Sequence, residues 1–199
     1  MKILALMPAY KYMEIPAVQS LVAMQADVYN NGDNINVAFV HGFNTSLART
    51  NLFEYAASVV DVDYVLNIDS DHIYKAKSLY TLISKIEDND LDMLSAGYYL
   101  RGGREFAHGR HIDGKFKKFK EGEVKGIVEC DVVGFGFLLM KSQFVKEMVK
   151  KFPKDLFKMD VDGNASEDVY FCKKAIENGS KVCFDADTIV GHLTTVVNQ

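Results

Sequence analysis

Residues 63–71 read DYVLNIDSD, an apolar segment over 63–68 that ends on Asp69-Ser70-Asp71. The segment predicts a short buried strand, and in open α/β sheets ligands bind beyond the carboxyl ends of the strands. Two carboxylates at such a position are hard oxygen donors that suit Mg²⁺ or Mn²⁺ carrying a diphosphate. Asp and Ser also cap helices, and among 27 acidic residues an isolated Asp-x-Asp arises easily by chance. The motif therefore needs support from the sequence around it.

Strand-like and helix-like segments alternate on both sides of this motif. This order is typical of an α/β fold in which crossover helices cover a mostly parallel sheet. We expect strands over 3–7, 35–40, 63–68 and 93–98, and helices that begin near Pro16, Ser46 and Ser78. The apolar spacing predicts inward-facing stripes of Val18, Leu21, Val22, Met24 and Val28 in the first helix and of Leu47, Leu52, Phe53, Ala56, Val59 and Val60 in the second.

The alternation breaks over residues 101–125, which are rich in glycine and carry eight basic against four acidic side chains. This composition predicts an exposed hairpin that turns near Asp113-Gly114. Its ordinary interpretation is a solvated hairpin, although phenylalanines between the charges also suit phosphate contacts and base stacking in a flap that binds an anionic acceptor. His108 and His111 are expected to be loop residues, because no Cys or third ligand is spaced for zinc.

The second half of the chain adds further candidate site residues. Gly134-Phe135-Gly136 fails as a dinucleotide fingerprint because Leu139 takes the third glycine position. Its glycines would let the backbone approach a sugar or an acceptor, or form a bulge. Glu167 and Asp168 begin a predicted helix, and His192 follows the last strand; Mn²⁺ accepts imidazole beside carboxylate. We expect the remaining strands over 127–133, 137–140 and 181–184, and helices over 144–150 and 167–178.

Length and composition indicate one domain. A chain of 199 residues buries enough surface for a core without disulfides, and its three cysteines form no CxxC pair, which favours a reducing compartment. The net charge of −4 gives no global nucleic-acid signature. No apolar stretch approaches the roughly 18 residues that span a bilayer. We expect a soluble cytoplasmic protein without a membrane span.

The ordered set of motifs resembles nucleotide-sugar-dependent glycosyltransferases of the GT-A fold. The resemblance covers nearly the whole chain and is closest to the small enzymes of phages and large viruses, which would place the protein in a host cytoplasm. It rests on Pro8-Ala9-Tyr10 after the first strand, Ala48-Arg49-Thr50-Asn51 before residues 63–71, Gly134-Phe135-Gly136-Phe137, and Ser166-Glu167-Asp168 leading to His192.

This resemblance implies a Rossmann-like, mostly parallel sheet flanked by helices, with a small second sheet or hairpin insertion on the acceptor side. Residues 1–100 would form the nucleotide-sugar half, 101–126 a basic flap, and 127–199 the acceptor and metal half of a single domain. The enzyme would transfer a hexose or pentose from a nucleoside-diphosphate sugar, with UDP favoured, to a hydroxyl acceptor such as a glycan or a modified nucleic acid.

The resemblance also implies roles for individual residues. Asp71 and His192 would bind Mn²⁺ or Mg²⁺, and Asp69 would bind the same metal or the donor ribose. Asp168, with Glu167, would act as general base in an inverting enzyme or contact the sugar in a retaining one; the alternative is a helix N-terminus rich in acids. The donor would contact Pro8, Ala9, Tyr10, Arg49, Asp69, Ser70, Gly134, Phe135 and Gly136.

Two other functions stay open at this point. A nucleotidyltransferase would use a similar carboxylate-bound metal, but it requires a glycine-rich triphosphate loop with Arg or Lys near the first strand. Residues 8–11, Pro-Ala-Tyr-Lys, do not form one. A nucleotide- or polyanion-binding module without turnover would use the basic flap instead.

Overall fold

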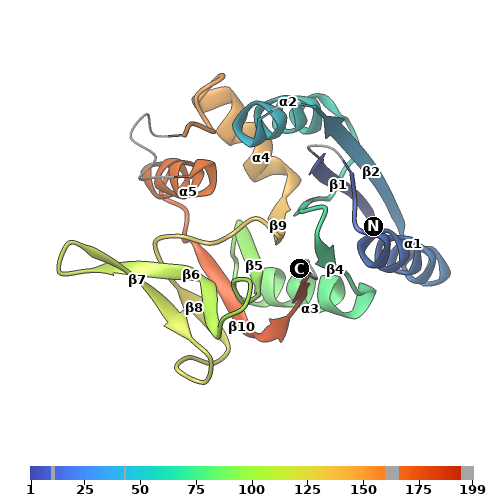
Figure 1. The fold of residues 1–199 in the computed structure, drawn as a ribbon. Coiled ribbons are helices and arrows are strands. Elements are labelled where there is room, and N and C mark those ends of the chain that lie inside the picture. The colour runs from blue at the N-terminus through green and yellow to red at the C-terminus, as the bar shows by residue number, and fades with distance from the viewer. Residues whose placement is uncertain (10–11, 43, 160–165, 194–199) are drawn as a thin grey trace.

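A computed structural model describes residues 1–9, 12–42, 44–159 and 166–193. Its centre is a seven-stranded sheet in the order β2-β1-β3-β9-β5-β10-β8, with helices on both faces (Figure 1). The strands of this sheet are β1 (Lys2–Ala9), β2 (Asn34–His41), β3 (Tyr64–Ile68), β5 (Met93–Gly97), β8 (Ile127–Glu129), β9 (Phe137–Lys141) and β10 (Cys183–Ile189). The helices are α1 (Ile15–Asn30), α2 (Thr45–Ser58), α3 (Ala76–Asp88), α4 (Ser142–Lys151) and α5 (Glu167–Glu177).

Most strands of the sheet run in one direction. β1 pairs in parallel with β2 and β3, and β5 pairs in parallel with β10, whereas β9 and β8 are antiparallel to their neighbours. The sheet is therefore mixed, and its five co-directional strands confirm the α/β expectation. Because the chain passes from β1 to β2 on one side and then to β3 on the other, the carboxyl ends of β1 and β3 flank a crevice of the kind that binds ligands in such folds.

The core consists of two apolar layers, one on each face of the sheet. Side chains alternate along β1, so that Leu4 and Leu6 pack with α2, α4 and α5, whereas Ile3 and Ala5 pack with α1 and α3. The two predicted helix stripes are partly wrong. Val18 and Val22 are 41% and 59% exposed, and Leu47 and Val60 are exposed as well. The buried face of α1 is instead Ala17, Leu21, Met24 and Val28, at spacings of four, three and four residues.

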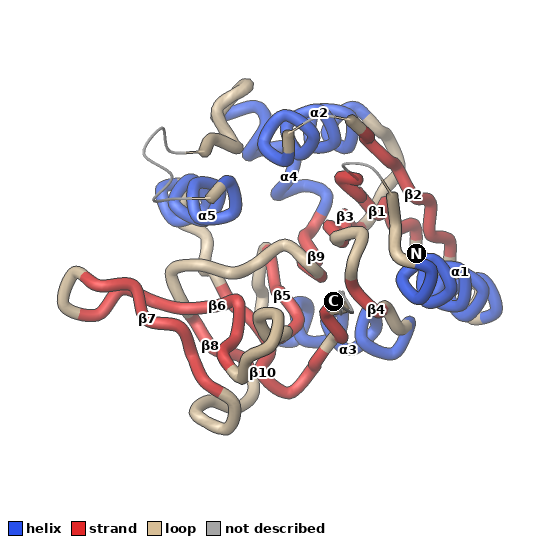
Figure 2. Tube along the Cα trace, in the orientation of Figure 1, coloured by secondary structure: helices blue, strands red, loops and turns tan. Residues whose placement is uncertain are grey.

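Two short ribbons complete the fold (Figure 2). One pairs β4 (His72–Ile73) with β11 (Gly191–His192), and the other is the predicted hairpin of β6 (Glu105–Ile112) and β7 (Lys115–Lys120). The hairpin turns at Asp113 and Gly114, whose φ angles of 52° and 73° fit a tight turn with two left-handed positions. The prediction of loop positions for His108 and His111 is wrong, because both lie within β6. His111 is exposed, whereas His108 is fully buried. The Nδ1 of His108 accepts a hydrogen bond from the Gly134 N–H at 3.1 Å.

The three cysteines, Cys130, Cys172 and Cys183, are buried and free. Among the described residues, no helix has both the length and the apolar character needed to cross a bilayer.

Candidate active site

Two adjoining cavities lie beyond the carboxyl ends of β1 and β3, and Asp69 and Asp71 line both. The first, of about 300 Å³, is lined by the predicted residues Pro8, Ala9, Arg49, Asp69, Ser70, Asp71 and Glu167. The second, also about 300 Å³, includes Asp69, Asp71, His72, Tyr98, Phe116, Lys118, Asp168 and His192. The structure thus brings together residues that the sequence predicts from five separate segments. Tyr10 lies outside the described residues.

Arg49 links the two halves of the site. Arg49 lies on the buried face of α2. The Asn44 side chain caps the first turn of this helix by accepting a hydrogen bond from the Leu47 N–H at 2.9 Å. Arg49 is 4% exposed; its Nη2 donates to Asp69 Oδ1 at 2.9 Å and its Nε to Glu167 Oε1 at 3.2 Å. Burial alone would lower the pKa of Arg49, but the neighbouring carboxylates outweigh it and raise the pKa. The guanidinium stays charged and holds Asp69 and Glu167 in place.

Asp71 accepts hydrogen bonds from several directions. Its Oδ1 lies 2.9 Å from His72 Nδ1, and its Oδ2 accepts from Arg101 and lies 3.5 Å from His192 Nε2. Burial opposes ionisation, but the hydrogen bonds from His192, His72 and Arg101 dominate and hold the pKa of Asp71 well below its usual range. Asp71 is therefore a carboxylate at any physiological pH. An ionised oxygen ligand is what a divalent cation requires.

His192 is oriented as a metal ligand would be. Its Nδ1 lies 3.0 Å from the Tyr99 carbonyl oxygen, so that Nδ1 carries a proton and donates it. The lone pair of Nε2 then accepts from Arg101 Nε at 3.3 Å. A backbone acceptor on one ring nitrogen that fixes the other for a metal is a common arrangement. Once protonated, Nε2 would instead donate to Asp71, and this interaction raises the pKa of His192, so protons compete with a metal for Nε2 as the pH falls.

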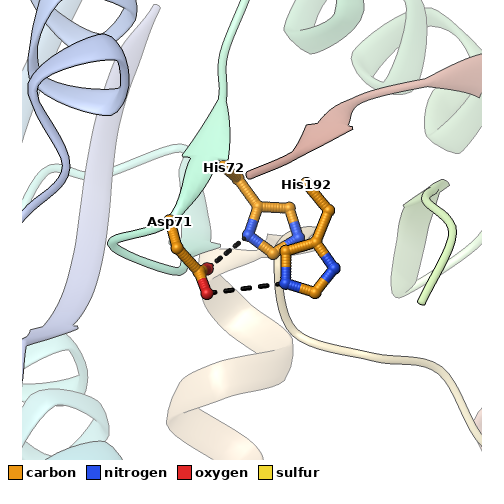
Figure 3. A group of neighbouring side chains, drawn as sticks. All are labelled: Asp71, His72 and His192. Atoms are coloured by element: carbon orange, nitrogen blue, oxygen red, sulfur yellow. Dashed lines mark hydrogen bonds and ion pairs between the residues drawn. The ribbon is translucent and has the colours of Figure 1, made fainter. Parts of the chain in front are cut away.

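His72 completes this group, and the sequence did not reveal it. It is paired with His192 across the β4–β11 ribbon, and the two rings stack at 4.4 Å between centroids (Figure 3). Ligand atoms of Asp71, His72 and His192 all lie within 4.8 Å of one another. The buried Nε2 of His72 has no hydrogen-bond partner among the described residues. His72 directly follows the Asp69-Ser70-Asp71 motif, which was the available sequence signal, and the pairing of β4 with β11 places it against His192.

This donor set fits a divalent cation. A carboxylate and an imidazole, from Asp71 and His192, suit Mn²⁺ better than Mg²⁺, which prefers oxygen ligands alone. His72 already uses Nδ1 on Asp71, so it positions that carboxylate, whereas Asp71 Oδ2 and His192 Nε2 face the cavity. Asp69 is turned toward Arg49 rather than toward His192.

Gly134, Phe135 and Gly136 lie behind the two cavities rather than on their walls. Phe135 is 1% exposed and packs beneath Arg49, whose guanidinium carbon is 4.8 Å from the ring centroid. A Cβ on Gly134 would come within 1.8 Å of Tyr98 Oη, and one on Gly136 within 2.3 Å of His72 Nε2. These contacts give the three residues a packing role beside the site, and their contact with the donor stays a prediction. The glycines make room for Tyr98 and His72.

Asp168 lies in the second cavity, on the first turn of α5. Its carboxylate accepts hydrogen bonds from Ser166 Oγ and, at 2.8 Å, from the Val169 N–H. Desolvation by burial raises the pKa of Asp168, with a further contribution from Glu167. A carboxylate with a raised pKa is a stronger base, and it faces the same space as Asp71 and His192.

Comparison with known proteins identifies the class of protein that this fold and site define. The model of the family "Glycosyl transferase family 2" matches residues 20–146, more than half of the chain. The chain therefore belongs to glycosyl transferase family 2, and it is a glycosyltransferase. No curated protein sequence matches it.

Solved structures agree with this fold. A197 from STIV superposes with a TM-score of 0.65 at 16% identity, over 100% of this chain and 97% of that one. S. aureus TarS 1-349 in complex with UDP-GlcNAc has a TM-score of 0.59 at 16% identity, over 100% of this chain and 60% of that one. GalNAc-T7 with UDP, GalNAc and Mn²⁺ has a TM-score of 0.63 at 9% identity, over 96% and 43%. At such identities the likeness establishes the GT-A-like fold.

Proposed function

We propose that this chain transfers a sugar from a UDP-sugar to a hydroxyl acceptor with a divalent cation, most favourably Mn²⁺, held by Asp71 and His192. The observation that carries the proposal is the convergence of Arg49, Asp69, Asp71, Asp168 and His192 on two adjoining cavities. UDP-GlcNAc and UDP with Mn²⁺ are the ligands in two of the similar structures, which supports this choice of donor and metal.

The first cavity fits the donor. Pro8 and Ala9 at the end of β1 form its wall, opposite Arg49 and Glu167. Asp69 is held by Arg49 and would accept hydrogen bonds from the donor ribose. A cation at Asp71 and His192 would neutralise the charge that builds on the departing diphosphate, so no protein acid is needed on that side.

The second cavity fits the acceptor, with Asp168 as general base. The acceptor oxygen forms a bond to the anomeric carbon while the bond from that carbon to the diphosphate oxygen breaks. The electron pair leaves with UDP, and the hydroxyl proton passes to the Asp168 carboxylate. Glu167 forms an ion pair with Arg49 at 3.2 Å, whereas Asp168 forms none among the described residues, so we assign the base role to Asp168. In a retaining enzyme Asp168 would contact the sugar instead.

The test is thermal stabilisation by UDP with and without Mn²⁺. Ligand at 100 times its dissociation constant should stabilise the wild-type protein by about 2.7 kcal/mol, and this gain should require the metal. Asp71→Asn should abolish the metal-dependent part. The control Asp90→Asn changes an exposed carboxylate that pairs with Lys141 at 3.5 Å, and it should respond like wild type. Metal-dependent stabilisation that survives in Asp71→Asn contradicts the metal assignment. A screen of UDP-sugars for slow hydrolysis with Mn²⁺ then identifies the donor.

A further inference from the structure

Strand β7 connects the second cavity to an open groove along the hairpin. Phe116 and Lys118 line the cavity that holds Asp168 and His192, and the same two residues line a groove of about 670 Å³ on the hairpin. Four basic and two acidic side chains face this groove: Arg110, Lys117, Lys118, Lys120, Glu105 and Glu123. The groove and the cavity that contains the proposed base therefore adjoin each other at Phe116 and Lys118. The hairpin extends from the sheet on the side where α5 lies (Figure 1).

The lysines of β7 are available to an anion. Lys115, Lys117, Lys118 and Lys120 are exposed, and among the residues that the structure describes none of their ammonium groups forms an ion pair. One of the groove's carboxylates is already engaged, because Glu123 Oε2 accepts from the Lys120 backbone N–H at 2.8 Å. Although the chain as a whole is acidic, this surface presents uncompensated positive charge.

Of the two phenylalanines on β7, Phe119 packs against the core and Phe116 is exposed. Phe119 is 8% exposed; it packs on Phe184 and lies under Arg110, and so holds the hairpin against the core. Phe116 is 40% exposed and lies across Gly109, where a Cβ would come within 2.7 Å of the ring. Residues two apart on a strand share a face, so Phe116, Lys118 and Lys120 form a line of one ring and two cations.

We propose that this line binds single-stranded nucleic acid and presents it as the acceptor to the active site. Lysines neutralise backbone phosphates, and an exposed ring offers a stacking platform for a base, which is how sequence-tolerant single-strand binding works. A phosphate polymer without bases would use the lysines but not Phe116. The acceptor role rests on the proposed function, whereas binding to β7 does not.

The experiment is fluorescence anisotropy of labelled 12-nucleotide dT and U oligomers with the full chain, over a range of salt concentrations. Lys118→Gln/Lys120→Gln should weaken binding and reduce the slope of log K against log salt by about 1.4, at about 0.7 per phosphate contact. Phe116→Ala should weaken binding by about fivefold or more through lost stacking. The matched control Lys77→Gln/Lys150→Gln makes the same charge change on α3 and α4 and should bind like wild type.

Competition with duplex DNA and with inorganic polyphosphate separates the possible polyanions. Single strands should bind more tightly than either competitor. The proposal fails if polyphosphate or duplex binds as tightly, if Phe116→Ala has no effect, or if the control variant weakens binding equally. UDP with Mn²⁺ is measured on the same samples. Oligomer binding without UDP binding would overturn the proposed function and the acceptor role, whereas UDP binding without oligomer binding would overturn this inference alone.

Discussion

Arg101 donates a hydrogen bond to Asp71 Oδ2, the carboxylate oxygen that faces His192. A cationic side chain thus contacts both atoms that we assign to the metal, and at 53% exposure it can turn out to solvent. Arg101→Gln should therefore bind Mn²⁺ about fivefold more tightly in the absence of UDP, because the removed pair is worth up to about 1 kcal/mol. Titration followed by electron paramagnetic resonance measures this affinity. Arg104→Gln is the control, since within the described part of the chain Arg104 pairs with Glu121 alone. Unchanged or weaker binding by Arg101→Gln would refute the competition.

Arg49 should matter for stability as well as for the donor. Arg49→Met leaves Asp69 and Glu167 as uncompensated charges, and breaking such a buried arrangement costs about 3–5 kcal/mol. Urea unfolding measures the loss, and adding Glu167→Gln to Arg49→Met should recover part of it. The control Lys2→Met removes an exposed pair with Asp61 and should cost less than about 1 kcal/mol. Equal losses in the two variants would show that the burial of Arg49 contributes nothing.

Gly136 should be needed for the metal group. In Gly136→Ala the new methyl overlaps the buried His72 ring, which must shift away from Asp71. We expect a loss of about 1–3 kcal/mol in stability and about tenfold in Mn²⁺ affinity. Gly103→Ala is the matched control, because its nearest atoms would be 3.9 Å away. Wild-type Mn²⁺ affinity in Gly136→Ala would argue against a positioning role for His72.

Asp168 should make the protein less stable as the pH rises. Burial raises its pKa in the folded state, so between the unfolded and the folded pKa the native protein binds more protons than the unfolded chain. The free energy of unfolding therefore falls with rising pH through this window. Asp168→Asn should be more stable than wild type at pH 7, and the difference should vanish below about pH 3.8, the ordinary value. Urea unfolding over pH 3–8 measures it. A variant less stable than wild type at pH 7 would contradict the desolvated carboxylate, and loss of sugar transfer in the same variant tests its role as base.

Much of the fold follows from local patterns. The strands 3–7, 35–40 and 63–68 and the turn at Asp113-Gly114 are where the sequence predicts them, because apolar runs and turn residues carry local signals. The sequence wrongly predicts that Val18 and Val22 face the core. Each directly follows a buried residue of α1, and the sequence alone does not distinguish apolar residues on the buried face from apolar residues beside it. Only tertiary packing decides which stripe is covered.

The site was predictable where motifs follow strands and not where distant segments meet. The position of Asp69 and Asp71 after a strand and the resemblance to GT-A enzymes indicate metal ligands in Asp69, Asp71 and His192, and the structure places Asp71 and His192 together. His72 directly follows the predicted motif, but its contact with His192 depends on the pairing of two short strands and is not visible in the sequence. The sequence predicts a loop position for His108 because its basic neighbours conceal a buried strand position. The roles of Asp69, Asp71 and His192 in binding the metal and the donor stay predictions.

The β4–β11 ribbon has a mechanical consequence. The ribbon contains two residue pairs and is extended by the Leu193 N–H, which donates to the Asp71 carbonyl oxygen at 2.8 Å. It connects the segment that follows β3 with the last described residues of the chain. A cation shared by Asp71 and His192 would act there as a non-covalent staple that closes a long loop. Chelation would loosen this ribbon first, and its amides would exchange with solvent hydrogen faster while the seven-stranded sheet keeps its protection.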